Sequence, residues 1–101
     1  MKYGIKKKHI ANVKDIFAGH KEIESVILYG SRAKGNYRPG SDIDLTLKGK
    51  NINLSLLNKI SIELDDLFLP YTFDLSIFDQ IDNSDLLEHI ERVGMVFWSR
   101  P

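Results

Sequence analysis

Residues 30–45 read Gly-Ser-Arg-Ala-Lys-Gly-Asn-Tyr-Arg-Pro-Gly-Ser-Asp-Ile-Asp-Leu, and they contain most of the residues that predict the fold and the candidate site. The apolar run before it, Ser-Val-Ile-Leu-Tyr, predicts a short buried strand that ends at Gly30. Residues 36–40 contain Asn, Pro and Gly, which is typical of a loop. Over residues 42–48 apolar and polar residues alternate, which predicts a half-buried strand. The stretch therefore joins two strands through a turn and a loop.

The turn at Gly30 has residues suited to phosphate. A glycine after a strand lets the backbone approach a ligand closely, and a short helix beginning there would offer its free amides to an anion. The Ser31 hydroxyl and the Arg32 guanidinium add further donors for phosphate oxygens. The segment also has the first spacing of a P-loop, but Asn36 and Tyr37 stand where that motif needs Lys and Ser or Thr. A P-loop is therefore excluded, and Gly-Ser alone is a common loop dipeptide.

Three aspartates are candidate metal ligands. Asp42 and Asp44 are two residues apart on one strand, so they share a face, with Cα atoms roughly 6.5 Å apart. Like charges this close repel each other, but hard oxygen ligands so placed can hold Mg²⁺ together with substrate phosphates. Asp74 lies on the polar face of a later strand and completes a triad if the two strands are neighbours. It would then be a metal ligand or the base for the acceptor's proton, whereas a solvent-exposed role is the alternative for each aspartate.

The rest of the chain alternates between helical and strand periodicity. We expect Gly19, Pro70 and Gly94 to end three helices, Asn53 or Ser55 to cap the second helix and Ser84 to cap the third. The order predicts an α/β (α+β) fold in which helices pack on one face of a small mixed β-sheet. The expected helices cover residues 5–17, 53–69 and 84–93, and the expected strands cover residues 25–29, 42–48, 71–78 and 95–98.

Composition limits the class of protein. With 101 residues, 43% of them hydrophobic, the chain suits a single packed domain over residues 1–101. Lys plus Arg and Asp plus Glu number 14 each, so bulk charge argues against direct nucleic-acid binding. The absence of cysteine excludes disulfides and thiolate metal sites. No signal-like or membrane-length apolar run is present, so we expect a cytoplasmic protein without membrane binding.

In order and spacing, these features resemble the signature of the polymerase-β-like nucleotidyltransferase superfamily. Residues 30–35 and 41–45 are similar in particular to the small MNT-type antitoxin domains. The resemblance implies a nucleotidyltransferase fold. It also implies that the three aspartates named above are catalytic and hold two Mg²⁺ ions, and that Gly30, Ser31 and Arg32 bind the triphosphate.

The resemblance also implies an activity and a partner. A nucleoside monophosphate, AMP from ATP, would be moved onto a hydroxyl of a small helical HEPN-type toxin, with the chain as its antitoxin. One alternative is a binding module of the same fold that neutralises a partner by contact without catalysis. Another is a small-molecule nucleotidyltransferase, although the chain looks short for an acceptor pocket unless it forms an oligomer. We expect none of the extra helical region that larger relatives use to bind base or acceptor, which leaves substrate selection open.

Other chemically suggestive residues receive plainer interpretations. The lysine run at residues 6–8 is interpreted as a solvated helix face, with phosphate binding as the alternative. The three histidines fit no common metal spacing and are expected to be surface or structural residues. Trp98, near the end of the chain, is expected to pack at the edge of the sheet.

Overall fold

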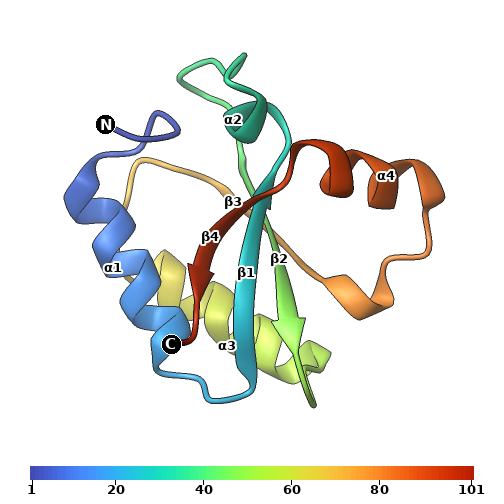
Figure 1. Ribbon diagram of the computed structural model, residues 1–101. Helices are drawn as coiled ribbons and strands as arrows, with labels where there is room; N and C mark the ends of the chain where they lie inside the picture. The colour runs from blue at the N-terminus through green and yellow to red at the C-terminus, as the bar shows by residue number, and fades with distance from the viewer.

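The chain folds around one mixed β-sheet, shown in Figure 1. The computed structural model describes residues 1–101. Its strands are β1 (Ile23–Tyr29), β2 (Ile43–Gly49), β3 (Phe73–Ile77) and β4 (Met95–Ser99), in the spatial order β3-β2-β1-β4. Its helices are α1 (Lys7–Ala18), α2 (Ser31–Lys34), α3 (Leu54–Asp65) and α4 (Ser84–Val93), and a 3₁₀ turn η1 (Phe78–Gln80) follows β3. The predicted fold class is confirmed. None of the helices is both long enough and apolar enough to span a membrane.

The sheet is mixed because β1 runs antiparallel to β2 and β4, whereas β2 and β3 are parallel. A parallel pair needs a crossover connection, and α3 supplies it between β2 and β3. Parallel strands begin at the same edge of the sheet. The first residues of β2 and β3 therefore meet there, next to the end of β1, which runs the opposite way.

The main core lies between one face of the sheet and helices α1 and α3. Ile43, Leu45 and Leu47 of β2 are fully buried there, with Phe17 from α1 and Leu64 from α3. Burial of each such side chain contributes roughly 1.5–3 kcal/mol. A one-residue slip of β2 would turn all three of its apolar side chains away from the core. The core therefore fixes which face of the sheet the intervening polar residues occupy.

Helix α4 crosses the other face of the sheet and packs on β1 (Figure 1). At its end the chain lies close to the sheet, because a Cβ atom on Gly94 would crowd the Ile27 side chain of β1; it would also overlap the Ile90 carbonyl of α4 itself. Helices α1 and α3 thus cover one face as predicted, whereas α4 lies on the opposite one.

Helix boundaries differ from the prediction in three places. Ile5 precedes α1 and reaches the core from a short bridge with Lys2. Helix α3 ends at Asp65, whereas the apolar periodicity predicted a helix to residue 69. Phe68 lies outside the helix, with a φ of 52° and 89% of its surface exposed. Asn83 caps α4, accepting a 3.0 Å hydrogen bond from the Leu86 amide. Ser84 is instead the first helical residue, because Asn serves as an N-cap as well as Ser does.

Candidate active site

Two of the predicted aspartates lie side by side on neighbouring strands. In the parallel pairing of β2 and β3, Asp44 is the register partner of Asp74. Asp44 projects away from the core that α1 and α3 cover, because its neighbours Ile43 and Leu45 point into that core. Asp74 is exposed and Asp44 is partly buried. Two carboxylates far apart in the sequence therefore share one end of one sheet face.

The surroundings of Asp44 oppose its ionisation. Burial, the charges of Asp74 and Asp42, and a hydrogen bond with Asp74 raise the pKa of the Asp44 carboxyl from 3.8 to about 6, while the Arg32 charge lowers it. A bound divalent cation relieves repulsion of this kind, because its charge offsets those of the carboxylates. Both ligands are also hard oxygens of the type that Mg²⁺ prefers. The donor set therefore fits a Mg²⁺ ion.

Asp42 stands at the rim of this carboxylate pair. It precedes β2 and is exposed, yet its charge is close enough to raise the pKa of Asp44. No three Asp, Glu, His or Cys side chains gather as a ready-made metal cage. Mg²⁺ commonly takes one or two carboxylates and completes its shell with water and substrate phosphates. Asp44 and Asp74 match that mode, with Asp42 positioned to join from the edge.

The turn at Gly30 brings the backbone directly against the carboxylates. Gly30 has a φ of 76°, a backbone conformation that residues other than glycine rarely adopt. A Cβ atom at this position would overlap Oδ2 of Asp44. Tyr29, the preceding residue, is the register partner of Asp44 across β1 and β2. The lack of a side chain at Gly30 therefore allows this turn to lie against the Asp44 carboxylate, and its close approach to a ligand stays a prediction. Ser31, the other predicted phosphate-binding residue, begins α2 immediately afterwards and is partly exposed.

His89 of α4 binds the Gly30 amide. The Gly30 N–H donates a 3.0 Å hydrogen bond to Nε2 of His89. The imidazole also packs edge-on against Tyr29, with ring centroids 6.1 Å apart. Sequence reasoning gave His89 no place in the site. The contact depends on how α4 crosses the sheet, and no local pattern signals that crossing.

Arg32 has a structural role in place of the predicted phosphate contact. It is only 3% exposed. Its Nε and Nη2 atoms donate to the Ser41 carbonyl at 3.0 and 2.8 Å, and Nη1 donates to the Tyr3 carbonyl at 2.9 Å. The rings of Tyr37 and Tyr71 lie within 5.6 Å of the guanidinium carbon. The side chain therefore ties α2 to the loop before β2 and to the N-terminal segment, and its donors are directed at backbone carbonyls.

A buried polar layer lies beside the carboxylates. Burial is the main cause that raises the pKa of the Tyr29 hydroxyl, and the charges of Asp74 and Asp44 raise it further. The Ser76 hydroxyl acts in the opposite direction and lowers the pKa of Tyr29, although the Ser76 oxygen forms no hydrogen bond by the usual geometric criteria. Tyr29 therefore keeps its proton at neutral pH and presents a donor close to two carboxylates.

Comparison with known proteins decides the family. The profile of the family described as "Polymerase beta, Nucleotidyltransferase" matches residues 11–101. The chain belongs to this nucleotidyltransferase family. No curated protein sequence matches the chain significantly.

The fold of this nucleotidyltransferase family member is similar to chains in solved toxin–antitoxin complexes. A toxin–antitoxin with AMP-PNP aligns with a TM-score of 0.71 at 15% identity, covering 95% of this chain and 75% of that one. A complex of tri-AMPylated Shewanella oneidensis HEPN toxin with MNT antitoxin aligns at 0.70 and 12%, covering 95% and 74%. An MntA–HepT complex aligns at 0.68 and 12%, covering 94% and 74%. At these identities the likeness shows the nucleotidyltransferase fold.

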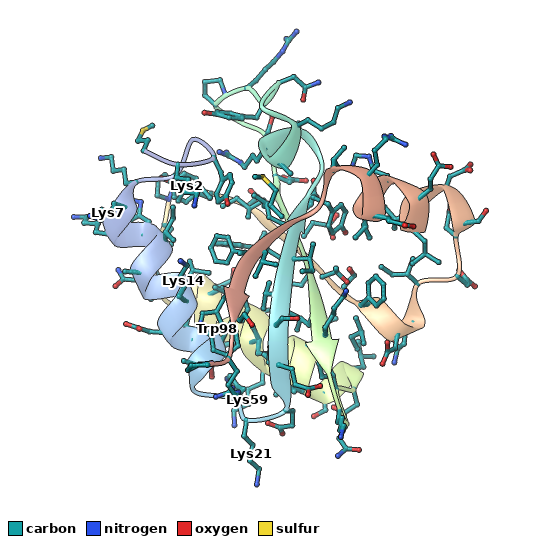
Figure 2. The ribbon with its side chains drawn as sticks, viewed as in Figure 1. Lys2, Lys7, Lys14, Lys21, Lys59 and Trp98 are labelled. Carbon is teal, nitrogen blue, oxygen red and sulfur yellow. The ribbon has the colours of Figure 1, made fainter.

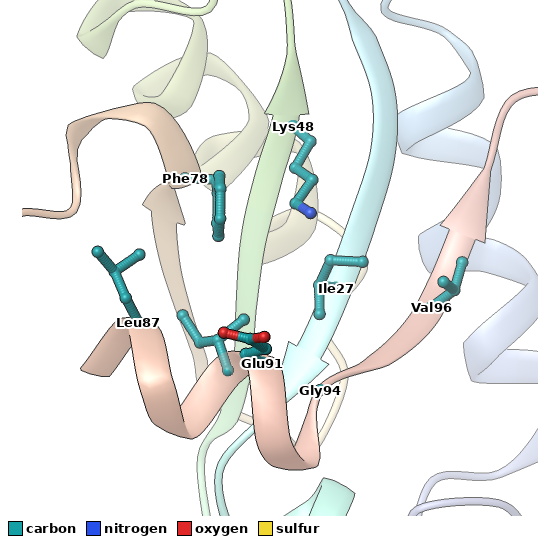
Figure 3. A pocket seen from close by; sticks show the side chains of 8 residues that line it. Ile27, Lys48, Phe78, Leu87, Glu91, Gly94 and Val96 are labelled. Carbon is teal, nitrogen blue, oxygen red and sulfur yellow. The ribbon is translucent and has the colours of Figure 1, made fainter. Parts of the chain in front are cut away.

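An apolar pocket of ≈ 390 Å³ lies elsewhere on the same sheet face, between α4 and the strands (Figure 3). Ile27, Leu87, Ile90 and Val96 are among its lining residues. Lys48 also lines it, at the opposite end of β2 from Asp44. The pocket therefore shares no lining residue with the carboxylate pair of this nucleotidyltransferase family member.

A group of lysines lies along and just before α1. Lys7 and Lys14 lie along α1, with Lys2 near its start (Figure 2). With Met1 and Ile10 they line a shallow hollow of ≈ 310 Å³. No carboxylate pairs with any of them. Helix α1 covers the face of the sheet opposite the carboxylates, and the lysines at residues 6–8 are all exposed, which agrees with a solvated helix face.

The remaining residues of interest have structural contacts. Nδ1 of His9 lies 3.0 Å from the Tyr71 hydroxyl oxygen, and Nε2 of His20 lies within hydrogen-bonding distance, 2.6 Å, of Oε1 of Glu63. Trp98 packs against Phe17 at the edge of the sheet, as predicted. His9 and His20 are thus structural residues, as the sequence led us to expect, and His89 alone of the three histidines touches the candidate site.

Proposed function

We propose that the chain is a Mg²⁺-dependent nucleotidyltransferase that moves AMP from ATP onto a hydroxyl of a HEPN-type toxin, and so acts as its antitoxin. The observation that carries this proposal is the in-register pair of Asp44 and Asp74 against the Gly30 turn. Membership of the nucleotidyltransferase family supports the reaction type. The structural neighbours, one solved with AMP-PNP and one containing an AMPylated toxin, support the choice of nucleotide and acceptor.

Each site residue has a distinct role in this proposal. Asp44 and Asp74 hold Mg²⁺, and Asp42 contributes from the rim. Ser31 and the backbone that follows Gly30 bind the triphosphate, because this turn lies directly beside Asp44. Bound Mg²⁺ would neutralise charge on the phosphates and align the attacking and leaving oxygens.

The transfer step makes one bond and breaks one bond. The acceptor hydroxyl oxygen attacks the α-phosphorus while the bond from that phosphorus to the bridging oxygen of the β-phosphate breaks. Pyrophosphate leaves with the bonding electrons. The hydroxyl proton passes to a carboxylate oxygen, for which exposed Asp74 is the candidate because it is open to an incoming acceptor. The product is a phosphodiester between AMP and the acceptor.

The direct test uses ATP labelled at the α-phosphate, MgCl₂ and a purified HEPN-type toxin. We expect the toxin to become labelled by the wild-type chain and not by Asp42→Asn. ATP labelled at the γ-phosphate should give no labelled toxin, which separates AMP transfer from phosphorylation. Absence of label with the wild-type chain, together with full inhibition of the toxin by Asp42→Asn, would show that the enzyme proposal is wrong.

The second candidate is an antitoxin of the same fold that neutralises its partner by contact alone. It is favoured by one observation: three ligating side chains do not gather into a preformed metal cage. The two candidates differ in what Asp42→Asn does, because contact alone does not need the carboxylate. Inhibition of the toxin that survives this substitution without any transferred label selects the contact-only antitoxin.

A further inference from the structure

The peptide groups on both sides of Gly30 are held by different helices. Its N–H donates to Nε2 of His89 on α4 at 3.0 Å. Its carbonyl accepts a 3.1 Å hydrogen bond from the Lys34 amide at the end of α2. Gly30 has a positive φ, and a glycine can adopt other backbone conformations about as readily. These two hydrogen bonds select one of those conformations and hold it.

The orientation of this turn matters because its backbone touches Asp44. A Cβ atom on Gly30 would overlap Oδ2 of Asp44, so a rotation of the turn would move the backbone against that carboxylate or away from it. His89 also packs edge-on against Tyr29, which is the register partner of Asp44. One imidazole therefore contacts both residues that connect β1 to the start of α2.

The hydrogen bond defines the state of the imidazole. A backbone N–H can only donate, so Nε2 of His89 must accept with a lone pair. The proton of the neutral ring is then on Nδ1. An imidazolium ion has no free lone pair and could not make this contact.

We propose that His89 is a positioning residue for nucleotide binding: through the Gly30 amide, α4 holds the phosphate-binding turn in register with Asp44 and Asp74. This inference rests on the proposed function of the site. His89 touches neither metal nor phosphate in this role. It acts by keeping the Gly30 peptide in one orientation, so that the backbone after it and the two carboxylates face the triphosphate together.

The test compares three substitutions of His89. His89→Leu removes the acceptor, His89→Asn is polar but too short to reach Gly30, and His89→Gln places an acceptor oxygen near the position of Nε2. We expect His89→Leu and His89→Asn to weaken Mg²⁺–ATP binding about tenfold, which corresponds to the loss of one hydrogen bond. His89→Gln should restore most of the affinity. Glu91→Gln, a change of an exposed residue on the same helix that lines the apolar pocket, is the matched control and should bind as the wild type does.

Two readouts separate positioning from a general loss of structure. The dissociation constant for Mg²⁺–ATP is measured by calorimetry, and hydrogen exchange of the Gly30 amide by NMR. Exchange should accelerate at Gly30 in His89→Leu and return towards the wild-type rate in His89→Gln. If His89→Leu does not fold, the same two measurements on His89→Asn replace it.

The outcomes distinguish this inference from the proposed function. If the wild-type chain binds Mg²⁺–ATP, Asp44→Asn loses that binding and both His89→Leu and His89→Asn retain it, the positioning role is wrong and the proposed function stands. Equal losses in His89→Gln and His89→Asn would also overturn the positioning role. A wild-type chain that does not bind Mg²⁺–ATP would overturn the proposed function and this inference together.

Discussion

At the scale of single residues, Asp44 shows how a functional arrangement opposes stability. Its raised pKa of about 6 means that the folded protein holds a proton more tightly than the unfolded chain does. The stability contribution of this group therefore falls as pH rises from about 4 to about 6, and the penalty is complete above that range. Clustered charges of this kind are typical of sites that bind a cation or an ionic substrate.

We predict that Asp44→Asn stabilises the metal-free protein at neutral pH. Removal of the charge should add on the order of 1 kcal/mol to the free energy of unfolding, after allowance for the partial exposure of the carboxylate. Urea unfolding in EDTA measures the difference at about pH 7.5 and again at about pH 4, where it should largely vanish. Asp79→Asn, on the exposed η1 turn, is the control and should change little. A destabilised Asp44→Asn protein at neutral pH would contradict this account of the cluster.

Gly30→Ala is predicted to damage both fold and site. The positive φ and the overlap of the added Cβ with Asp44 Oδ2 should together cost about 1–3 kcal/mol of stability. The matched control is Gly40→Ala, because a Cβ there meets nothing within 4 Å and its φ is not positive. Urea unfolding should separate the two variants by at least 1 kcal/mol, roughly the lower end of that range. Equal stability of the two would mean that the turn is not held against the carboxylate.

At the scale of elements, α2 depends on one side chain for its position. It has four residues, too few for a helix to be stable by itself, and Arg32 fixes it by donating to the Ser41 and Tyr3 carbonyls. Arg32→Lys keeps the charge but loses the fork of donors, so we expect about 2–3 kcal/mol of destabilisation in urea unfolding. The exposed Arg38→Lys is the control and should be neutral. If Arg32→Lys leaves the free energy of unfolding unchanged, the Arg32 guanidinium is not needed to hold α2, and it remains a candidate phosphate ligand as the sequence suggested.

The elements also show what the sequence could predict. Periodicity of two along β2 correctly assigned Ile43 and Leu45 to the core and Asp44 to the other face, because strand alternation is a local property. Capping was predicted within one residue, since Asn83 and Ser84 are chemically equivalent as caps. The end of α3 was misplaced, because the apolar spacing continues into Phe68 after the helix has ended.

At the scale of the whole molecule, the contacts that local patterns could not predict are those that join distant elements. The pairing of Asp44 with Asp74 was conditional on a strand order that only the parallel crossover determines. Arg32 was expected to face phosphate, and its true direction depends on where residues 3 and 41 lie in space. His89 reaches Gly30 only because α4 crosses the face opposite α1 and α3. Residue types in the sequence could therefore identify candidate functional side chains, whereas the tertiary fold determines which hydrogen-bond donors remain free to bind a ligand.

The charge of the chain is also distributed unevenly at this scale. The first 21 residues contain six lysines and one aspartate, so the remaining 80 residues carry an equal excess of negative charge. A net charge of zero therefore conceals a basic α1 side and an acidic remainder that includes the candidate site. Because surface charges are screened over about 10 Å at 0.1 M salt, the adjacent carboxylates contribute most to the electric field at the candidate metal site.

Calorimetric titration of ATP into the protein, with and without MgCl₂, measures directly whether the carboxylate pair holds Mg²⁺ and the nucleotide. The wild-type chain should bind ATP only when Mg²⁺ is present, and Asp44→Asn and Asp74→Asn should each weaken that binding at least tenfold, about 1.4 kcal/mol or more. Asp79→Asn should leave it unchanged. Binding that is independent of Mg²⁺, or that survives in both Asp44→Asn and Asp74→Asn, would contradict the claim that this carboxylate pair holds the metal and the nucleotide.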